Sequence, residues 1–371
     1  MKDTLIKTWA LFFGFSILCL GHGLQGTLIG VRAMYEGFSL TSIGLITAGF
    51  YIGYLIGSMI IPVLLNRVGH IRVFAALASV ASVAILLHTI ILNPFTWFLF
   101  RILTGVSIAG IYVIMESWLN DKSSNETRGQ LLSVYMIVTF VFAGLGQFLL
   151  NLSDPMKVNL FILVSILLSI SLVPILLTAT QAPTFENPKR FSLKELYIIT
   201  PLGFVGALIT GLTHGTVFGY GAIYATAKDF STFQISLFMV IVTAFGAISQ
   251  WPIGYLSDKN DRRIIIIGCC ITSSIFAVLS IMASGISFEN LFVEEMFRFN
   301  YFSTDTSMDK TKLFIFIILL SGMTLPLFAL NLALVNDYIP KEKFVAAGAG
   351  LNIIFEGHFL LIILTLLQSL S

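Results

Sequence analysis

Long apolar runs separated by short polar segments extend along the whole chain. Ile198–Ala227 contains no Asp, Glu, Lys or Arg over about 30 residues, and Ile264–Phe288 contains none over about 25 residues. A helix of about 20 apolar residues crosses the hydrocarbon layer of a bilayer, where every backbone polar group must be bonded within the segment. Each run is therefore predicted to be a membrane-spanning helix. The runs predict eleven spans, at residues 8–31, 42–65, 71–92, 95–119, 131–151, 157–179, 196–224, 233–256, 264–285, 312–335 and 344–369.

The composition fits a membrane protein and argues against several other classes. Hydrophobic residues make up 57% of the 371 residues and charged residues 11%, whereas soluble proteins carry about 25% charged residues. The three cysteines, Cys19, Cys269 and Cys270, lie inside apolar runs and indicate neither a disulfide framework nor a metal site. The sequence has no HExxH or GxSxG motif and no Walker-type loop, so neither an enzyme nor an ATP-driven pump is expected. No metal, cofactor or nucleic acid partner is predicted.

Positive charges sort the predicted loops into two sets. With the N-terminus in the cytoplasm, fourteen of the 21 Lys and Arg residues lie in cytoplasmic segments and six in external segments, while Arg101 lies inside a span. Membrane proteins carry their excess of Lys and Arg in cytoplasmic loops. The N-terminus is therefore predicted to be cytoplasmic, and a chain of eleven spans is predicted to end outside.

Two pairs of polar segments indicate that the chain is a tandem repeat. The segment that begins at Asn66, after span two, matches the segment at Asp258, after span eight, at an offset of 192 residues. Asn120-Asp121 after span four matches Asn336-Asp337 after span ten at an offset of 216, so about 24 residues are inserted between spans nine and ten. We predict an N-terminal six-helix bundle at 1–180, a cytoplasmic linker at 181–195, and a five-helix C-terminal bundle at 196–371 with an external insertion at 286–311.

The loop after span eight carries a recognisable motif. Asp258-Lys259-Asn260-Asp261-Arg262-Arg263, preceded by Gly254, resembles the loop motif of the major facilitator superfamily, and Arg101-x-x-x-Gly105 resembles that superfamily's Arg–Gly motif in span four. The first-half loop is degenerate, with Asn66 and Pro62 at two motif positions. Glu116–Asn120 and Gly69–Arg72 are similar to a bacterial subgroup of the same superfamily. The resemblance reaches about Phe355 and implies an all-α membrane transporter with two helical bundles.

Charged and polar residues at the ends of the spans are candidate gating contacts. A carboxylate such as Asp258, beside Arg262 and Arg263, can form an ion pair across the cytoplasmic face in one conformation and lose it in the other. The alternative is that these charges only anchor the loops on the cytoplasmic side. The candidate latch residues are Asn66, Arg67, Arg72, Glu116, Asp258, Arg262 and Arg263.

Polar faces on spans one, four, seven and ten are candidate walls of the substrate cavity that the resemblance implies. Arg101 is the strongest candidate, because a charge inside hydrocarbon costs at least about 2.5–3.5 kcal/mol and usually has a function. Together with Arg32 near the outer mouth, it favours a substrate that carries a carboxylate or another anionic group. The alternatives are a structural link from Arg101 to neighbouring carbonyls and a packing role for His214. The candidate substrate contacts are Gln25, Arg32, Arg101, Tyr112, His214, Tyr220 and Asn331.

Small residues on span two predict a close helix contact. Gly49, Gly53 and Gly57 are four residues apart, and Gly105 lies on span four; such glycines let another backbone approach. The resemblance places span two against span eleven, so this surface is expected to serve in gating as well as packing.

The C-terminal region departs from the superfamily. A twelfth span is missing, and Glu356 and His358 lie in the middle of the eleventh. This pair is either a proton site or part of a tail that is not under functional selection.

The leading hypothesis is a monomeric secondary transporter in a bacterial-type inner membrane, with a small organic solute and the lipid bilayer as its partners. A coupling proton or ion stays open, because span one contains no buried acid. The alternative is a membrane sensor or receptor that uses the same fold without transport.

Overall fold

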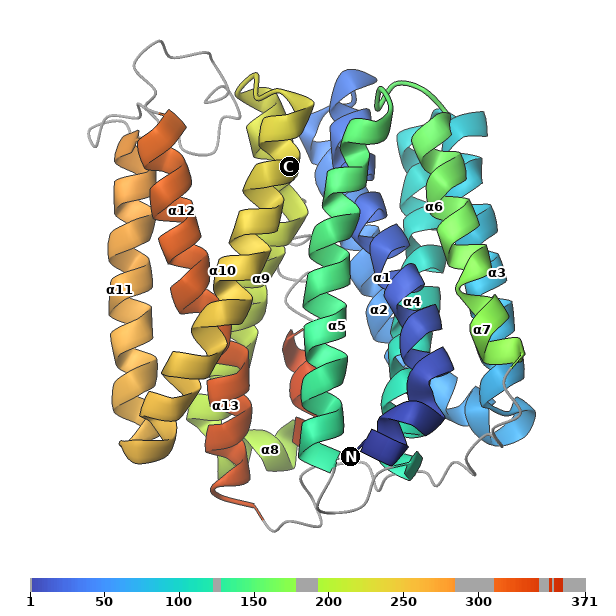
Figure 1. The fold of residues 1–371 in the computed structure, drawn as a ribbon. Coiled ribbons are helices and arrows are strands. Elements are labelled where there is room, and N and C mark those ends of the chain that lie inside the picture. The colour runs from blue at the N-terminus through green and yellow to red at the C-terminus, as the bar shows by residue number, and fades with distance from the viewer. Residues whose placement is uncertain are drawn as a thin grey trace. The chain divides into compact units, whose positions relative to one another are not determined.

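The computed structural model describes residues 2–122, 128–177, 193–283, 310–339, 347–348 and 350–355. All regular structure in these residues is helical. The chain divides into two compact units, Met1–Pro188 and Lys189–Ser371 (Figure 1). The predicted insertion at 286–311, most of the eleventh span and the Glu356–His358 pair lie outside the described residues.

The helices of the first unit are α1 (Lys2–Tyr35), α2 (Leu40–Val68), α3 (His70–Ile90), α4 (Pro94–Lys122), α5 (Arg128–Phe148), the 3-10 helix η1 (Leu149–Leu152), α6 (Asn159–Ile170) and α7 (Leu172–Leu176). Within this unit α2 and α3 both pack on α4, and α1 packs on α5 and α6. The contact between α2 and α4 is the most extensive.

The helices of the second unit are α8 (Leu193–Ile199), α9 (Pro201–Ala227), α10 (Thr232–Lys259), α11 (Arg262–Ala283), α12 (Lys310–Thr324) and α13 (Pro326–Asn336). Here α10 packs on α12 and α13, α11 packs on α12, and α9 packs on α13. The second unit therefore repeats the arrangement in which the second and third spans of a half both pack on its fourth. Residues of the eleventh span, Ala347, Leu351 and Ile354, join the core formed by Leu196, Ala207 and Val335.

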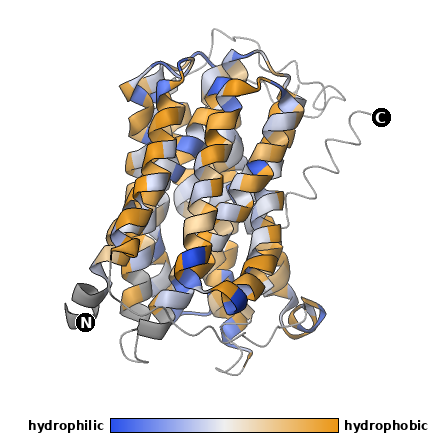
Figure 2. Ribbon diagram, turned by 90° about the vertical axis from the view of Figure 1, so that its right-hand side faces the viewer, coloured by the Kyte–Doolittle hydropathy of each residue, from blue (hydrophilic) through white to orange (hydrophobic). Residues whose placement is uncertain are grey.

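Apolar side chains lie on the surface of the helices as well as in the core. Ten helical segments among the described residues are long and apolar enough to cross a membrane. Large apolar side chains such as Trp251 (80% exposed) and Ile90 (74% exposed) face outward, and Figure 2 shows hydrophobic positions over much of the visible helix surface. A surface of this kind is unfavourable in water and suited to lipid. The predicted all-helical membrane fold is confirmed.

Three of the predicted spans are interrupted. The sequence predicts span seven from residue 196, but α9 begins at Pro201, because a residue before proline is driven out of the helical region and Thr200 has φ −137° and ψ 73°. Span ten is divided into α12 and α13 just before Pro326, whose ring nitrogen cannot donate a helical hydrogen bond. Span six is divided at Ser171, whose hydroxyl donates to the Leu168 carbonyl oxygen at 2.7 Å.

The same turn joins α1 to α2 and α9 to α10, at the offset of 192 residues found in the sequence. Gly37 (φ 73°) and Asp229 (φ 56°) both adopt the left-handed conformation that ends a helix. In both turns the next N–H donates to the carbonyl oxygen five residues earlier, at 3.1 Å. Ser39 and Ser231 then cap the following helices through their hydroxyl groups. The repeat in the sequence is therefore also a repeat in local structure.

Candidate functional site

Arg101 lies within the membrane-spanning part of α4 and is buried, with 6% of its surface exposed. Its guanidinium carbon is 4.4 Å from the centre of the Phe50 ring on α2, which is a cation–π contact. In the described parts of the chain no carboxylate forms an ion pair with Arg101, and its Nε has no hydrogen-bond partner. The first unit therefore holds a buried cation whose charge is not neutralised by these residues.

Side chains of α1 and α4 surround the same phenyl ring. The half-buried His22 stacks on Phe50 with ring centres 5.6 Å apart, and lies 6.4 Å from the ring of Tyr112. Gln25, on the same side of α1 as His22, is fully buried, and neither atom of its amide has a hydrogen-bond partner among the described residues. Buried polar groups are usually bonded to protein or ordered water, so these groups have capacity for a ligand or water. We call His22, Gln25, Phe50, Arg101 and Tyr112 the Arg101 cluster.

Glycines bring α2 and α4 close enough to form the Arg101 cluster. A Cβ on Gly53 would lie 2.0 Å from the Ile102 carbonyl oxygen, and a Cβ on Gly105 would lie 1.9 Å from the Phe50 carbonyl oxygen. The other two glycines of the span-two stripe also meet α4. The expectation that this stripe packs against span eleven is therefore wrong, because α4 already occupies it. Phe50, which the sequence analysis missed, is placed by this contact and adjoins Gly49 in the sequence.

Arg32 links two segments of the first unit. It lies inside α1, not in an external loop, and its guanidinium forms an ion pair with Glu36 at 2.6 Å. It also donates to the carbonyl oxygens of Pro155, at 3.1 Å, and Met156. The side chain thus joins the end of α1 to the segment between η1 and α6. Because Glu36 and two carbonyl oxygens already bind the guanidinium, we do not propose Arg32 as a substrate contact.

A second group of polar side chains lies farther along α4. The Tyr135 hydroxyl on α5 donates to Glu116 Oε1 at 3.4 Å, and the Tyr135 ring is 6.3 Å from that of Tyr112. Glu116 itself is exposed. Aromatic rings therefore connect the Arg101 cluster with the one acidic side chain in the described part of span four.

The candidate contacts of the second unit lie on α9 and α13. The His214 Nε2 is 3.2 Å from the carbonyl oxygen of Thr324. Asn331 Nδ2 donates to Thr210 Oγ1 at 3.2 Å, whereas its buried Oδ1 has no partner among the described residues. Tyr220 is half-buried on α9. The first contact joins α9 to the end of α12, and the second joins α9 to α13. The Oδ1 atom of Asn331 can accept a hydrogen bond from a ligand.

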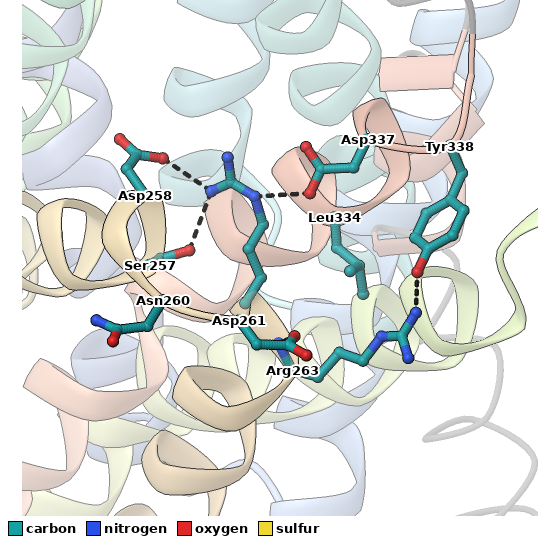
Figure 3. A pocket seen from close by; sticks show the side chains of 9 residues that line it. Ser257, Asp258, Asn260, Asp261, Arg263, Leu334, Asp337 and Tyr338 are labelled. Atoms are coloured by element: carbon teal, nitrogen blue, oxygen red, sulfur yellow. Dashed lines mark hydrogen bonds and ion pairs between the residues drawn. The ribbon is translucent and has the colours of Figure 1, made fainter.

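The loop between α10 and α11 holds an ionic network (Figure 3). Arg262 donates from Nε to Asp337 Oδ2 at 2.8 Å and from Nη1 to Asp258 Oδ1 at 2.9 Å. On the other side of a pocket of about 400 Å³, Arg263 donates to the Tyr338 hydroxyl. Asp258 and Arg262 thus form a local ion pair, four residues apart, and the network also ties the start of α11 to Asp337, the residue that follows α13.

Nearly the whole sequence matches one family model. The profile of the Major Facilitator Superfamily matches residues 11–362. The chain belongs to this superfamily. It is 26% identical over 258 residues to the uncharacterized MFS-type transporter YcaD of Escherichia fergusonii, a match that covers 69% of this chain and 68% of that protein. The corresponding Escherichia coli protein matches with the same identity and coverage.

Solved structures of superfamily transporters share the fold. A variant of the nucleoside transporter NupG has a TM-score of 0.72 at 12% identity, over 96% of this chain and 89% of that chain. The D-xylose-proton symporter has a TM-score of 0.65 at 13% identity, over 97% of both chains. At such low identity these similarities concern the fold alone.

In the first half of this superfamily member, two residues of the second-half network are replaced, whereas Asp121 is retained at the position of Asp337. Asn66 replaces Asp258 at the offset of 192 residues, and His70 replaces Arg262. The His70 Nε2 is 2.9 Å from the Ser117 hydroxyl oxygen on α4. The other two candidate latch residues of this loop, Arg67 and Arg72, are exposed. The two loops therefore use different chemistry at equivalent positions.

We expect the variants Arg262→Gln and Asp337→Asn to be non-additive, because each removes the same ion pair. The side chains are 23% and 48% exposed, so solvent screening limits the pair to about 1 kcal/mol. Each single variant should lower the apparent melting temperature by about 2–4 °C. The double variant should lower it no further than the more damaging single variant. Size-exclusion chromatography after heating measures these temperatures, and full additivity would contradict the network.

Proposed function

We propose that this superfamily member is a secondary transporter that carries a small organic anion across the membrane by alternating access. The single observation behind this proposal is Arg101, a buried cation in a membrane-spanning helix without an ion-pair partner in the described residues. A buried charge is stabilised by a partner of opposite sign. A carboxylate substrate would supply that partner when it binds.

The proposed substrate contacts divide between the two units. In the first unit, Arg101 binds the anionic group, while Gln25 and Tyr112 offer an amide and a hydroxyl group to the rest of the solute. In the second unit, Asn331, His214 and Tyr220 are the proposed contacts, and Asn331 has an open acceptor.

The proposed gate includes the network around Arg262. An ion pair between separate helices has two discrete states, formed and broken, and can therefore bias a conformational equilibrium. Arg262 is bound at once by Asp258 on α10 and by Asp337, which follows α13, and a link between separate segments suits a contact that is remade during the cycle. We further propose that these loops face the cytoplasm of a bacterial-type cell, because their side carries the excess of Lys and Arg.

Uptake of matched solutes into proteoliposomes tests the proposed substrate class. Each carboxylate is compared with the amide of the same shape, for example benzoate with benzamide and succinate with succinamide. We expect at least one carboxylate to enter at a rate well above that of empty liposomes, while its amide does not. Equal uptake of both members of every pair, or uptake of neither, would contradict the assignment.

A further inference from the structure

We propose that His22 is the proton acceptor of this transporter and that it takes up a proton when an anion binds to Arg101. The inference rests on the proposed function, since it needs an anion at Arg101. The inference adds a coupling proton and assigns it to a residue of span one, which contains no Asp or Glu.

The geometry places the two groups on one phenyl ring. The guanidinium carbon of Arg101 and the ring centre of His22 are 4.4 and 5.6 Å from the centre of Phe50, so they lie within about 10 Å of each other. The Nδ1 atom of His22 is buried and has no hydrogen-bond partner among the described residues. An imidazole nitrogen without a partner can accept a proton.

The charge of Arg101 decides whether that proton is accepted. Two cations within about 10 Å repel each other strongly where little water screens them. While Arg101 is not neutralised, His22 therefore stays neutral. An anion at Arg101 removes the repulsion and adds an attractive charge, so His22 becomes an imidazolium. Because linkage is reciprocal, the proton also strengthens binding of the anion.

Apart from Arg101, one titratable group on the helices around His22 can carry a charge within the predicted spans, and it is a carboxylate. The helices that pack on α1 are α2, α4, α5, α6, α7 and η1. Within the predicted spans of α2, α4 and α5, the titratable side chains besides Arg101 are tyrosines and one carboxylate. They are Tyr51 and Tyr54 on α2, Tyr112 and Glu116 on α4, and Tyr135 on α5. Cys19 is a turn away on α1 itself, and α6, α7 and η1 contribute no titratable side chain. Glu116 is the competing proton carrier and is separated by the test below.

The proposed step is a simple protonation. A proton from the solution binds to Nδ1 of His22 as the anion binds to Arg101, and no other bond is made or broken. After the site opens to the other side, departure of the anion restores the repulsion, and the proton leaves with it. One proton therefore accompanies each anion.

Proton uptake on binding tests this proposal directly. Benzoate is the probe, because its carboxylate suits Arg101 and its ring suits the aromatic surroundings. Purified full-length protein in weak buffer at about pH 6, where histidine titrates most readily, is mixed with benzoate in the presence of a pH-sensitive dye. We expect about one proton to be taken up per benzoate bound, and the affinity for benzoate to rise about tenfold for each unit by which the pH falls in this range.

Two variants identify the acceptor. His22→Gln should still bind benzoate, with lower affinity and without proton uptake, whereas Glu116→Gln should keep both. Proton uptake that survives in His22→Gln, or benzoate binding to wild type without a proton, would overturn the role of His22. Absence of benzoate binding to wild type would overturn the assigned contact between the carboxylate of benzoate and Arg101, on which the protonation of His22 depends. Binding and proton uptake without any transport would instead refute the proposed function and leave the linkage intact.

Discussion

Replacing Arg101 with glutamine is expected to raise the KM for carboxylate uptake by about 10- to 100-fold. A hydrogen bond to a charged group contributes about 1.5–3 kcal/mol, and each 1.4 kcal/mol corresponds to about a tenfold change in affinity. Arg101→Lys keeps the charge but loses the planar pair of donors, so its KM should fall between those of the other two proteins. Initial rates in proteoliposomes over a range of solute concentrations give these values.

The Arg101→Gln protein should fold normally. Arg101 forms no ion pair with a carboxylate among the described residues, so its removal leaves no partner charge buried alone. Lys157→Gln is the matched control, because it removes a positive charge from an exposed position of the same unit. Its kinetics should be those of wild type. If Arg101→Gln transports carboxylates with an unchanged KM, Arg101 does not contact the substrate.

Replacing Gly53 with alanine is expected to destabilise the first unit. The added Cβ would lie 2.0 Å from the Ile102 carbonyl oxygen and 2.8 Å from its carbon. Both are backbone atoms of α4, which cannot turn aside as a flexible side chain does, so α2 and α4 must separate. Overpacking costs about 1–3 kcal/mol even where side chains can adjust. We expect a lower apparent melting temperature and a smaller yield of monodisperse protein.

Gly144→Ala provides the control for Gly53→Ala. Gly144 lies inside α5, and a Cβ added there would meet no atom within 4 Å. Alanine is favoured over glycine within a helix by about 1 kcal/mol, so this variant should be as stable as wild type or slightly more stable. The intrinsic gain applies equally to Gly53→Ala, and any loss seen there is therefore due to contact with α4. Equal melting temperatures for the two variants would contradict the close packing of α2 on α4.

The sequence predicts the membrane helices well, because the rule behind them is local. A backbone in lipid has to bond with itself, so the apolar runs locate the spans without any knowledge of tertiary contacts. The breaks at Thr200 and before Pro326 follow from the geometry of proline and are readable in principle. The division at Ser171 has a similar signal, because Pro174 cannot donate a helical hydrogen bond to the carbonyl oxygen of Ile170, where α6 ends.

The candidate site is less predictable, because its contacts join distant parts of the chain. The position of Arg101 inside a span marks it as a candidate site residue, but its contact with Phe50 depends on how the glycines of α2 and α4 fit together. Arg32 has the same kind of charge near the end of a span, but its guanidinium bonds to carbonyl oxygens more than 120 positions away. Residue type and depth therefore identify candidates, while long-range packing assigns their roles.

The repeat in the sequence does not predict how equivalent residues of the two loops are bonded. Equivalent positions in a repeat are expected to act alike, yet His70 and Arg262 are bound in different ways, to a serine hydroxyl in one half and to two aspartates in the other. An ion pair and a neutral hydrogen bond differ in strength and in their response to salt. The two halves are therefore expected to contribute unequally to gating.

Counterflow in proteoliposomes tests the central claim, a single anion site that opens to each side of the membrane in turn. Vesicles loaded with a high concentration of unlabelled carboxylate are diluted into a trace of the same labelled solute. The account predicts that label accumulates transiently above its external concentration in wild-type vesicles, and that Arg101→Gln greatly reduces this accumulation. Label that only equilibrates, as through a channel, or that does not enter at all, as for a receptor, would contradict it.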